Sequence, residues 1–302
     1  MLKLTKNLEE ANLVTHGGTF HPDDVFSTVL MSKIIENPVV YRAVSTTEAS
    51  YPGKTVYDVG FGEFDHHGPD ALMRNDKIKY CSFGLLWKRY GKEYLSKITD
   101  DVDELWKEID RVLVMQIDGI DNGNFPKIEA DYHLLDLDAI IDLFNMGWNE
   151  EIDNDDQFIK AVNFASNIFD RVVIKEKAKL EAKKIVTEKI KQTEGEILIL
   201  DAYMPYIDAL FDKKIKEAEK IKIVVFPSNR HGYNVKPRVV SKDSKELLLT
   251  FPKELLGLHG EELVEKTKLK TARFVHSEGF IAAADSLEDA IALAKIALNN
   301  KE

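Results

Sequence analysis

The longest uninterrupted helical pattern constrains the fold most, because it divides the chain into two parts. Between residues 156 and 191 there is neither Pro nor Gly, and apolar residues recur at helical spacing. The pattern predicts one long helix or a pair of helices, and it ends before Gly195. We therefore expect a first domain at residues 1–155, a connecting helix at 156–194 and a smaller domain at 195–302.

The part before the long helix alternates between strand-like and helical segments. The order strand, helix, strand, strand predicts an α/β domain with a mainly parallel sheet and flanking helices. The expected strands are residues 12–15, 39–44 and 55–59, and the expected helices are residues 24–36, 82–90 and 102–117.

The part after the long helix also combines short strand-like segments with a helix, and it predicts a smaller α/β domain. The expected strands are residues 196–200, 221–226, 233–240, 246–250, 273–276 and 280–283, and the expected helix is 287–298.

The composition limits the classes of partner. A net charge of -11 argues against a surface coated in basic residues for long nucleic acids. The same net charge is compatible with a short or single-stranded nucleic-acid substrate that binds in a local basic groove. No run approaches about 18 apolar residues, so we expect no membrane span. The start of the chain lacks a signal-peptide core, and Cys81 is the only cysteine, which predicts a cytoplasmic protein without an intrachain disulfide.

Four short segments of the first part concentrate His and Asp. Loops that leave the carboxyl ends of parallel strands are where α/β sheets bind ligands. Any one of these segments alone is more often a helix cap, a turn or a surface group. Together, however, they hold four of the eight His, and carboxylate with imidazole but no thiolate suits Mn²⁺, Mg²⁺ or Co²⁺. The segments are residues 15–24 (THGGTFHPDD), 57–60 (YDVG), 65–67 (DHH) and 117–123 (IDGIDNG).

The chain lacks the motifs of other hydrolytic chemistries. It contains no Gly-x-Ser-x-Gly segment and no phosphate loop that ends in Gly-Lys-Ser/Thr. Cys81 has no neighbouring signal of a catalytic thiol. Among hydrolytic mechanisms, the absence of these motifs leaves one in which two cations, about 3.5–4 Å apart, share and activate a water molecule.

The order of these four segments is similar to that in the DHH phosphoesterase superfamily. Within it, residues 15–24 resemble the first loop of the Myg-type (melanocyte proliferating gene) exonuclease family, whose members are also described as metal-dependent protein hydrolases. The family's other motifs resemble residues 58–60, 65–67, 117–123 and 274–281, so the resemblance covers residues 12 to 298.

The resemblance implies a site for two divalent metal ions, Mn²⁺ first, with Mg²⁺ or Co²⁺ as alternatives. Asp58 would bridge both ions and take part in catalysis. Asp121 would complete the second ion's ligands, with Asp118 as the alternative or as a group behind the ligands. His67, the other catalytic residue, would face the substrate phosphate or orient a ligand. The implied metal ligands are His16, His21, Asp23, Asp58, His66 and Asp121.

The same resemblance implies that the second domain closes over the metals and binds the substrate. The side chains expected to do so are basic or polar, and several belong to the last motif. They are Arg230, His231, Lys236, Arg238, Arg273, His276 and Ser277, together with the backbone at Gly279.

The activity that the resemblance implies is a divalent-metal-dependent phosphoesterase: a 3'-5' exonuclease or oligonucleotide phosphodiesterase that uses a metal-bridging hydroxide. RNA or a short single-stranded oligonucleotide would be the substrate, and a homodimer is the assembly we consider. One alternative is a pyrophosphatase or small-nucleotide phosphatase, which should have Lys and Arg around a tiny pocket in the second domain. The other is a metal-binding module without enzymatic activity, against which the intact ligand positions argue.

Overall fold

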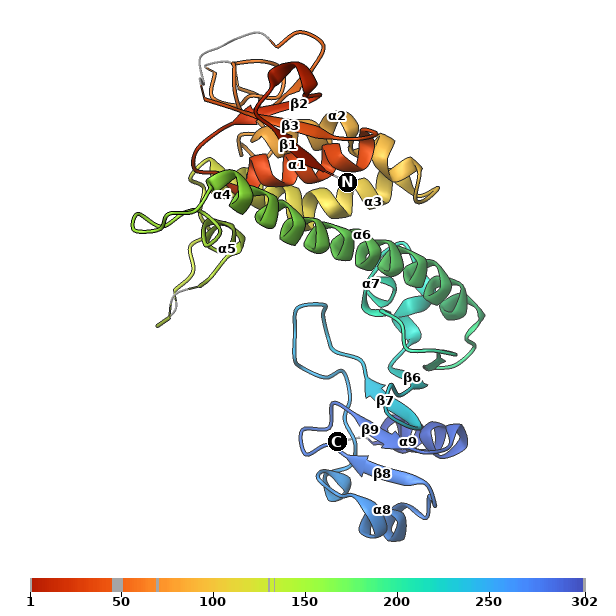
Figure 1. The fold of residues 1–302 in the computed structure, drawn as a ribbon. Coiled ribbons are helices and arrows are strands. Elements are labelled where there is room, and N and C mark those ends of the chain that lie inside the picture. The colour runs from red at the N-terminus through yellow and green to blue at the C-terminus, as the bar shows by residue number, and fades with distance from the viewer. Residues whose placement is uncertain (1, 45–50, 69–70, 130, 133, 301–302) are drawn as a thin grey trace. The chain divides into compact units, whose positions relative to one another are not determined.

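The chain forms two compact units, Met1–Lys177 and Ala178–Glu302, called the N-terminal and C-terminal units below. The boundary lies within one helix, α6 (Asn154–Gln192), so the expected helical segment is a single long helix rather than a pair. The computed structural model describes residues 2–44, 51–68, 71–129, 131–132 and 134–300 (Figure 1).

The N-terminal unit is built on a sheet of four parallel strands in the order β1-β3-β2-β4, which confirms the expected α/β class. Three of the strands were expected from their apolar segments, and β1 was not. The strands are β1 (Lys3–Thr5), β2 (Leu13–His16), β3 (Val39–Ala43) and β4 (Thr55–Val56).

Helix α1 (Pro22–Ile34) lies against this sheet, and further helices pack beside it (Figure 1). Pro22 occupies the first turn, where its missing N–H costs no hydrogen bond. The helix expected at residues 102–117 consists of α3 (Val102–Ile109) and a wide π-helical turn, Asp110–Val114. This turn leads into α4 (Met115–Asp121). The remaining helices of this unit are α2 (Ser82–Ser96) and α5 (Leu137–Asp142).

The C-terminal unit contains a mixed sheet of five strands in the order β5-β6-β7-β9-β8. β5 and β6 are parallel, and the other neighbours are antiparallel. The strands are β5 (Ile197–Ile199), β6 (Ile223–Pro227), β7 (Tyr233–Pro237), β8 (Ala272–Val275) and β9 (Ala282–Ala284), and the helices are α7 (Ile207–Leu210), α8 (Gly260–Thr267) and α9 (Leu287–Asn299).

Alternating residues of this sheet belong to two different cores. Val225 and Val235 pack in a core with residues of α9 such as Leu293. On the opposite face, Val224 and Phe226 pack in a second core with residues of α7 and of the end of α6. The second core covers β5 and β6, and no residue of β7, β8 or β9 belongs to it.

The strand expected at residues 246–250 is wrong. Leu247 makes one isolated bridge to Val239, and Leu248 donates a backbone hydrogen bond to Arg238. Pro252 follows closely, and a proline cannot donate to a strand ladder. Of the apolar residues here, Leu249 packs against the α9 core, whereas 47% of Leu248 is exposed.

Within the described residues, no helix has both the length and the apolar character that crossing a membrane requires.

Two glycines in helices of the N-terminal unit should respond oppositely to alanine. A Cβ at Gly84 would overlap the carboxylate of Asp118, whereas one at Gly119 would have Asn124 O as its nearest neighbour, at 3.5 Å. Gly84→Ala should lower the free energy of unfolding by about 1–3 kcal/mol through overpacking. Gly119→Ala should leave it unchanged or raise it by roughly 0.5–1 kcal/mol. Denaturant titration of both variants checks this, and equal effects would contradict the packing.

Candidate metal centre

His16 ends β2 and points one ring nitrogen into a cluster of carboxylates. Its Nδ1–H donates to the carbonyl oxygen of Gly17 at 3.1 Å. Its Nε2 therefore faces Asp58 Oδ2 at 3.2 Å and Asp24 Oδ2 at 3.4 Å. A histidine that binds a metal through one nitrogen commonly donates the other N–H to a carbonyl. The sharp turn after His16 needs glycine, because a Cβ at Gly17 would lie 3.0 Å from Ala43 O.

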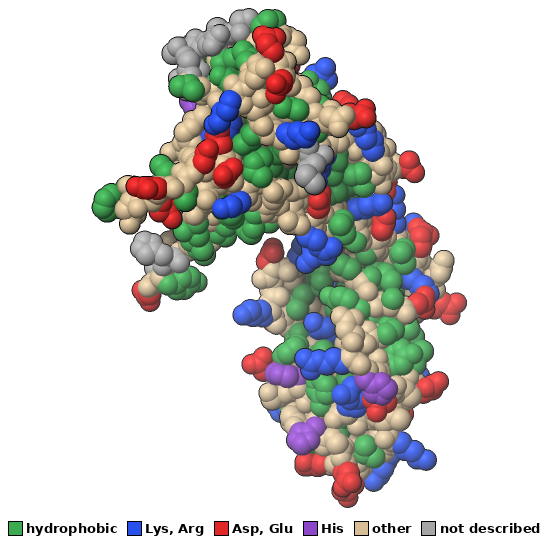
Figure 2. Space-filling view, in the orientation of Figure 1, with side chains coloured by type: hydrophobic (Ala, Val, Ile, Leu, Met, Phe, Trp, Pro, Cys, Tyr) green, Lys and Arg blue, Asp and Glu red, His purple; other side chains and the backbone are tan. Residues whose placement is uncertain are grey.

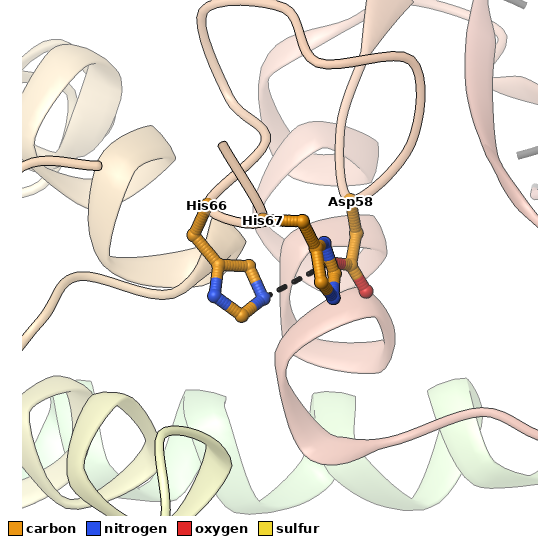
Figure 3. Close-up of side chains that lie close together, drawn as sticks. All are labelled: Asp58, His66 and His67. Carbon is orange, nitrogen blue, oxygen red and sulfur yellow. Dashed lines mark ion pairs between the residues drawn. The ribbon is translucent and has the colours of Figure 1, made fainter. Parts of the chain in front are cut away.

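Asp58 follows β4 in a left-handed backbone conformation, with φ of +56°. Such a φ is uncommon outside glycine and marks a strained turn. The turn is held by the Asp58 N–H, which donates to Phe64 O at 3.1 Å. The carboxylate is buried, and its Oδ1 lies 3.3 Å from His66 Nε2. Figure 3 shows this pair and the ring of His67 beside it.

His66 connects Asp58 to two further carboxylates. Its Nε2 lies 3.2 Å from Asp121 Oδ2 and 3.7 Å from Asp23 Oδ2. Two sets of potential ligand atoms each lie within 4.8 Å of one another: Asp58, His66 and His67, and Asp23, His66 and Asp121. His66 belongs to both sets, so the two groups form one continuous cluster.

His67 lies at the rim, with 57% of its side chain exposed. Asp65 Oδ1 accepts hydrogen bonds from the backbone N–H of His67 at 3.0 Å and from its Nδ1 at 2.8 Å. The other oxygen of Asp65 accepts the N–H of Phe61. The hydrogen bond to Asp65, together with the negative charges of Asp58 and Asp65, raises the pKa of His67 above its ordinary value. Asp65 therefore orients a partly exposed imidazole beside the carboxylate cluster.

The buried carboxylates need cations. Both oxygens of Asp23 and one oxygen each of Asp24, Asp58 and Asp121 are buried and have no hydrogen-bond partner in the described part of the chain. Burying a carboxylate without a partner is costly. Oxygen and imidazole ligands suit hard divalent ions such as Mn²⁺ and Mg²⁺. The residues present therefore fit a divalent metal site.

The pKa values report the same crowding of negative charge. Burial, together with the charges of Asp58 and Asp121, raises the pKa of Asp23 well above its usual range. Burial also raises the pKa of Asp24 to about 6 and that of Asp121 above its ordinary value. Three carboxyl groups would thus resist ionisation unless a positive ion compensates them.

Asp58 and His16 shift in the directions expected of an ion pair. Burial opposes the ionisation of Asp58, but the neighbouring imidazoles of His16 and His66 outweigh it and lower its pKa. Burial likewise opposes protonation of His16, yet the hydrogen bond to Asp58 and the charge of Asp24 raise its pKa to about 9. The imidazolium stands where a metal ion would provide the positive charge.

Asp118 and Asp121, the two alternatives from the sequence, lie in different surroundings. Asp121 is in the cluster with His66. Asp118 is buried in an ion pair with Arg74 and accepts the backbone N–H of Cys81 at 2.9 Å. It belongs to neither set of potential ligands. Asp121 therefore lies among the potential ligands, whereas Asp118 contacts Arg74 and Cys81.

His21 lies in a different position from the other expected ligands. It is exposed at the start of α1, its ring centroid lies 6.0 Å from that of His16, and it belongs to neither ligand set. It lines a cavity of about 530 Å³ together with His16, Asp58 and His66. Its backbone N–H donates to Asp24 Oδ1 at 2.9 Å.

Asp24 and Asp65 had no site role predicted from the sequence, and both lie beside histidines of the carboxylate cluster. Asp24 is fully buried beside His16, and Asp65 orients His67. Both stood in the quoted motifs. A pair of acids in the first turn of a helix is also the ordinary pattern of favourable charge at a helix N-terminus, so the pattern alone did not single out Asp24.

The loop between β2 and α1 is fastened by residues that no motif contains. The carbonyl oxygen of Gly18 accepts hydrogen bonds from Arg42 Nη2 and Asn154 Nδ2, both at 2.7 Å. The side chain of Asn145 bonds both the N–H and the carbonyl of Phe20 at 3.0 and 2.9 Å. These contacts hold the loop that separates His16 from His21.

The expected substrate-binding residues fall into separate places within the C-terminal unit. Arg230, Lys236 and Arg273 line one cavity of about 370 Å³. Arg238 instead donates to backbone carbonyls, including that of Leu210 at 2.9 Å, which is a structural contact.

The residues of the last motif surround a tight turn. Gly279 has φ of +69°, and a Cβ there would overlap the side chain of Thr250. His276 Nδ1 accepts the backbone N–H of Glu278 at 3.1 Å, and Ser277 is exposed. The ring of His231 lies 3.5 Å from Asp285 at the surface.

One solved structure resembles this chain weakly. It is a pGpG-specific phosphodiesterase from Vibrio, 14% identical, and the match covers 94% of this chain and 96% of that one. The TM-score of 0.28 is too low for any inference about this chain.

Relatives that match this chain over most of their own length show its family. The MYG1 protein of Dictyostelium discoideum is 31% identical over 97% of this chain and 98% of its own length. The MYG1 protein of Saccharomyces cerevisiae is 26% identical, with 98% of both chains covered. The human MYG1 exonuclease is 24% identical over 97% of this chain and 87% of its own. The model of the MYG1 exonuclease family, described as an uncharacterised protein family (UPF0160), matches residues 12–298. This chain therefore belongs to the MYG1 family.

Proposed function

We propose that the chain is a divalent-metal-dependent phosphoesterase that cleaves phosphodiester bonds in RNA or short single-stranded oligonucleotides. One observation carries the proposal: buried carboxylates from three separate segments meet around His16 and His66, and several of their oxygens have no hydrogen-bond partner among the described residues. The name of the human relative, MYG1 exonuclease, supports a nucleic-acid substrate.

The ligands of two metal ions would come from both sets of neighbouring side chains. Divalent ions bound there would lower the pKa of water and neutralise charge on a phosphate. Asp58 lies between His16 and His66, which suits a carboxylate shared by both ions. The other ligands we propose are Asp23, Asp121 and, from the rim, His21, with Asp24 beside His16.

His67 would act on the substrate directly. It is exposed, it lines the cavity, and Asp65 favours its protonated form. A protonated imidazole can donate a charge-assisted hydrogen bond to a phosphate oxygen as negative charge develops there. Asp65 holds the ring in place and so has a positioning role.

For the metal we propose Mn²⁺, and for the reaction we propose 3'-5' exonucleolytic cleavage. The cavity of about 530 Å³ supports action at a chain end, because it falls in the size range of small-ligand sites. The mixed carboxylate and imidazole ligands support Mn²⁺, with Mg²⁺ or Co²⁺ as alternatives.

Replacing the shared carboxylate should abolish the activity. Asp58→Asn should slow the shortening of a labelled oligonucleotide in Mn²⁺ by at least about 100-fold. Replacing a residue that only supports a metal ligand already lowers metal affinity or activity by about 10- to 100-fold. Asp100→Asn, at an exposed position, is the matched control and should cleave normally. Circular dichroism should show both variants folded. Normal cleavage by Asp58→Asn would remove Asp58 from the site.

Metal binding should stabilise the protein. Ions that bind only the folded state raise the free energy of unfolding by about 2.7 kcal/mol at 100 times the dissociation constant. Thermal unfolding with Mn²⁺ should therefore have a higher midpoint, and EDTA should reverse the change. The Asp58→Asn variant should show a much smaller increase. A midpoint independent of Mn²⁺ in the wild-type protein would contradict the proposed site.

Asp23 should destabilise the metal-free protein. Its raised pKa means that the folded state holds a proton more tightly than the unfolded state does. The free energy of unfolding of the metal-free protein should therefore fall as pH rises above the ordinary Asp pKa of about 3.9.

The variant Asp23→Asn isolates this effect. It should be more stable than the wild type at pH 7 in EDTA, should lose less stability between pH 4 and pH 7, and should bind Mn²⁺ at least about 10-fold more weakly. Urea titrations at several pH values measure the first two effects and calorimetry measures the third. A variant less stable than the wild type in EDTA would show that Asp23 has a favourable partner without metal.

A further inference from the structure

An exposed aromatic ring lines the same cavity as the carboxylate cluster of the N-terminal unit. Phe61 is 61% exposed and borders the cavity of about 530 Å³ together with Asp58 and His67. Val59 and Ile120 also line this cavity, and none of its described lining residues is Lys or Arg. The cavity therefore combines apolar side chains with the carboxylates and imidazoles of the candidate metal centre.

The backbone at Phe61 is strained, and ordinary turn chemistry does not explain its side chain. Its φ of +56° lies in the left-handed region, where a bulky residue is an outlier. Glycine or asparagine is the usual residue in such a conformation. Gly60 has φ of +82° and Asp58 φ of +56°, so three of the four residues from 58 to 61 are left-handed. Strained residues of this kind cluster at functional sites, where neighbouring contacts hold them in place.

The carboxylate of Asp65 holds Phe61 and His67 in a fixed relation. Its Oδ2 accepts the backbone N–H of Phe61 at 2.7 Å, and its Oδ1 accepts a hydrogen bond from His67 Nδ1 at 2.8 Å. Only 3% of the Asp65 side chain is exposed, so water competes little for these contacts. One buried side chain thus positions both exposed rings on the same cavity.

Exposure alone would not single out Phe61, because other apolar side chains of the N-terminal unit are exposed as well (Figure 2). Phe125 is also 61% exposed. It lines a different cavity, of about 490 Å³, which no described residue of the carboxylate cluster borders. Phe61 differs from Phe125 because it shares a cavity with the candidate metal ligands and has a strained backbone.

We infer that Phe61 is a specificity-determining residue whose ring stacks on a nucleobase next to the phosphodiester at the metal centre. Every base has a π-face that an aromatic side chain accepts, so the stacking would tolerate different bases. His67 would contact the phosphate while Phe61 contacts the base attached to it. This inference rests on the proposed function and names the part of the substrate that the cavity recognises.

The surroundings of Phe61 favour a nucleotide over pyrophosphate as the substrate. Pyrophosphate has no apolar surface, so it gains nothing from an exposed aromatic ring. It also carries more negative charge than a phosphodiester, and the cavity has no Lys or Arg among its described lining residues. A base attached to a phosphodiester would instead cover the ring and remove apolar surface from water.

The test is calorimetry with the full chain, Mn²⁺ and two uncleavable ligands. The first is diadenylate with methylene groups in place of both bridging oxygens of the phosphodiester, and the second is the same compound without its bases. The wild type should bind the first ligand more tightly than the second. Phe61→Ala should weaken binding of the first ligand by about 5- to 150-fold, the range expected for one stacked base, and leave binding of the second unchanged.

Three further variants identify stacking as the cause. Phe61→Trp keeps an aromatic face and should retain the preference for the ligand with bases. Phe61→Leu keeps an apolar side chain without that face and should lose most of the preference. Phe125→Ala removes a ring of equal exposure from the other cavity and should bind as the wild type does. Circular dichroism should show all variants folded.

The outcomes separate the role of Phe61 from the proposed function. An equal loss of affinity for both ligands in Phe61→Ala, unchanged affinities in that variant, full preference in Phe61→Leu, or no binding by the wild type would each overturn the stacking role. Hydrolysis of ordinary diadenylate by the wild type with Mn²⁺ tests the proposed activity independently. A base preference that depends on Phe61, without any hydrolysis, would overturn the phosphoesterase and leave the stacking role standing.

Discussion

Repulsion among buried carboxylates is the constraint on which the N-terminal unit depends. Asp23, Asp24, Asp58 and Asp121 are held close together around the imidazoles of His16 and His66. A protein normally avoids such an arrangement, because unpaired buried charge is costly. The surrounding fold therefore keeps these groups in place at the expense of its own stability, as is common at functional sites.

The local backbone explains how the groups are held together. Gly17 lets the chain turn tightly beside Ala43, and the left-handed conformation of Asp58 directs its carboxylate inward. The parallel sheet brings the ends of β2 and β4 to the same edge. Arg42 also holds the loop after β2 through Gly18, so the loop between His16 and Asp23 is tied to β3.

The sequence predicted the parts of this structure that depend on local pattern. The parallel sheet, the long helical segment and the four segments rich in His and Asp follow from periodicity, from the absence of Gly and Pro, and from the clustering of His with Asp. The strand wrongly expected at residues 246–250 shows the limit, because an apolar run also suits tertiary packing without a ladder.

The remaining features depend on contacts between distant segments. Arg74 reaches Asp118, and Asn145 reaches Phe20, across 44 and 125 residues, and no local pattern encodes such pairs. The alignment of Phe226 with Phe274 likewise exists only once strand register is known. Register is decided by the whole sheet, so sequence alone left these aromatic residues unassigned.

The boundary between the two units falls inside the hydrogen-bonded turns of α6, between Lys177 and Ala178. Cutting the chain there would leave unpaired carbonyls on one fragment and unpaired amides on the other. Fragments designed for separate expression should therefore divide the chain at an end of α6, near Asn154 or Gln192, so that one fragment keeps the whole helix.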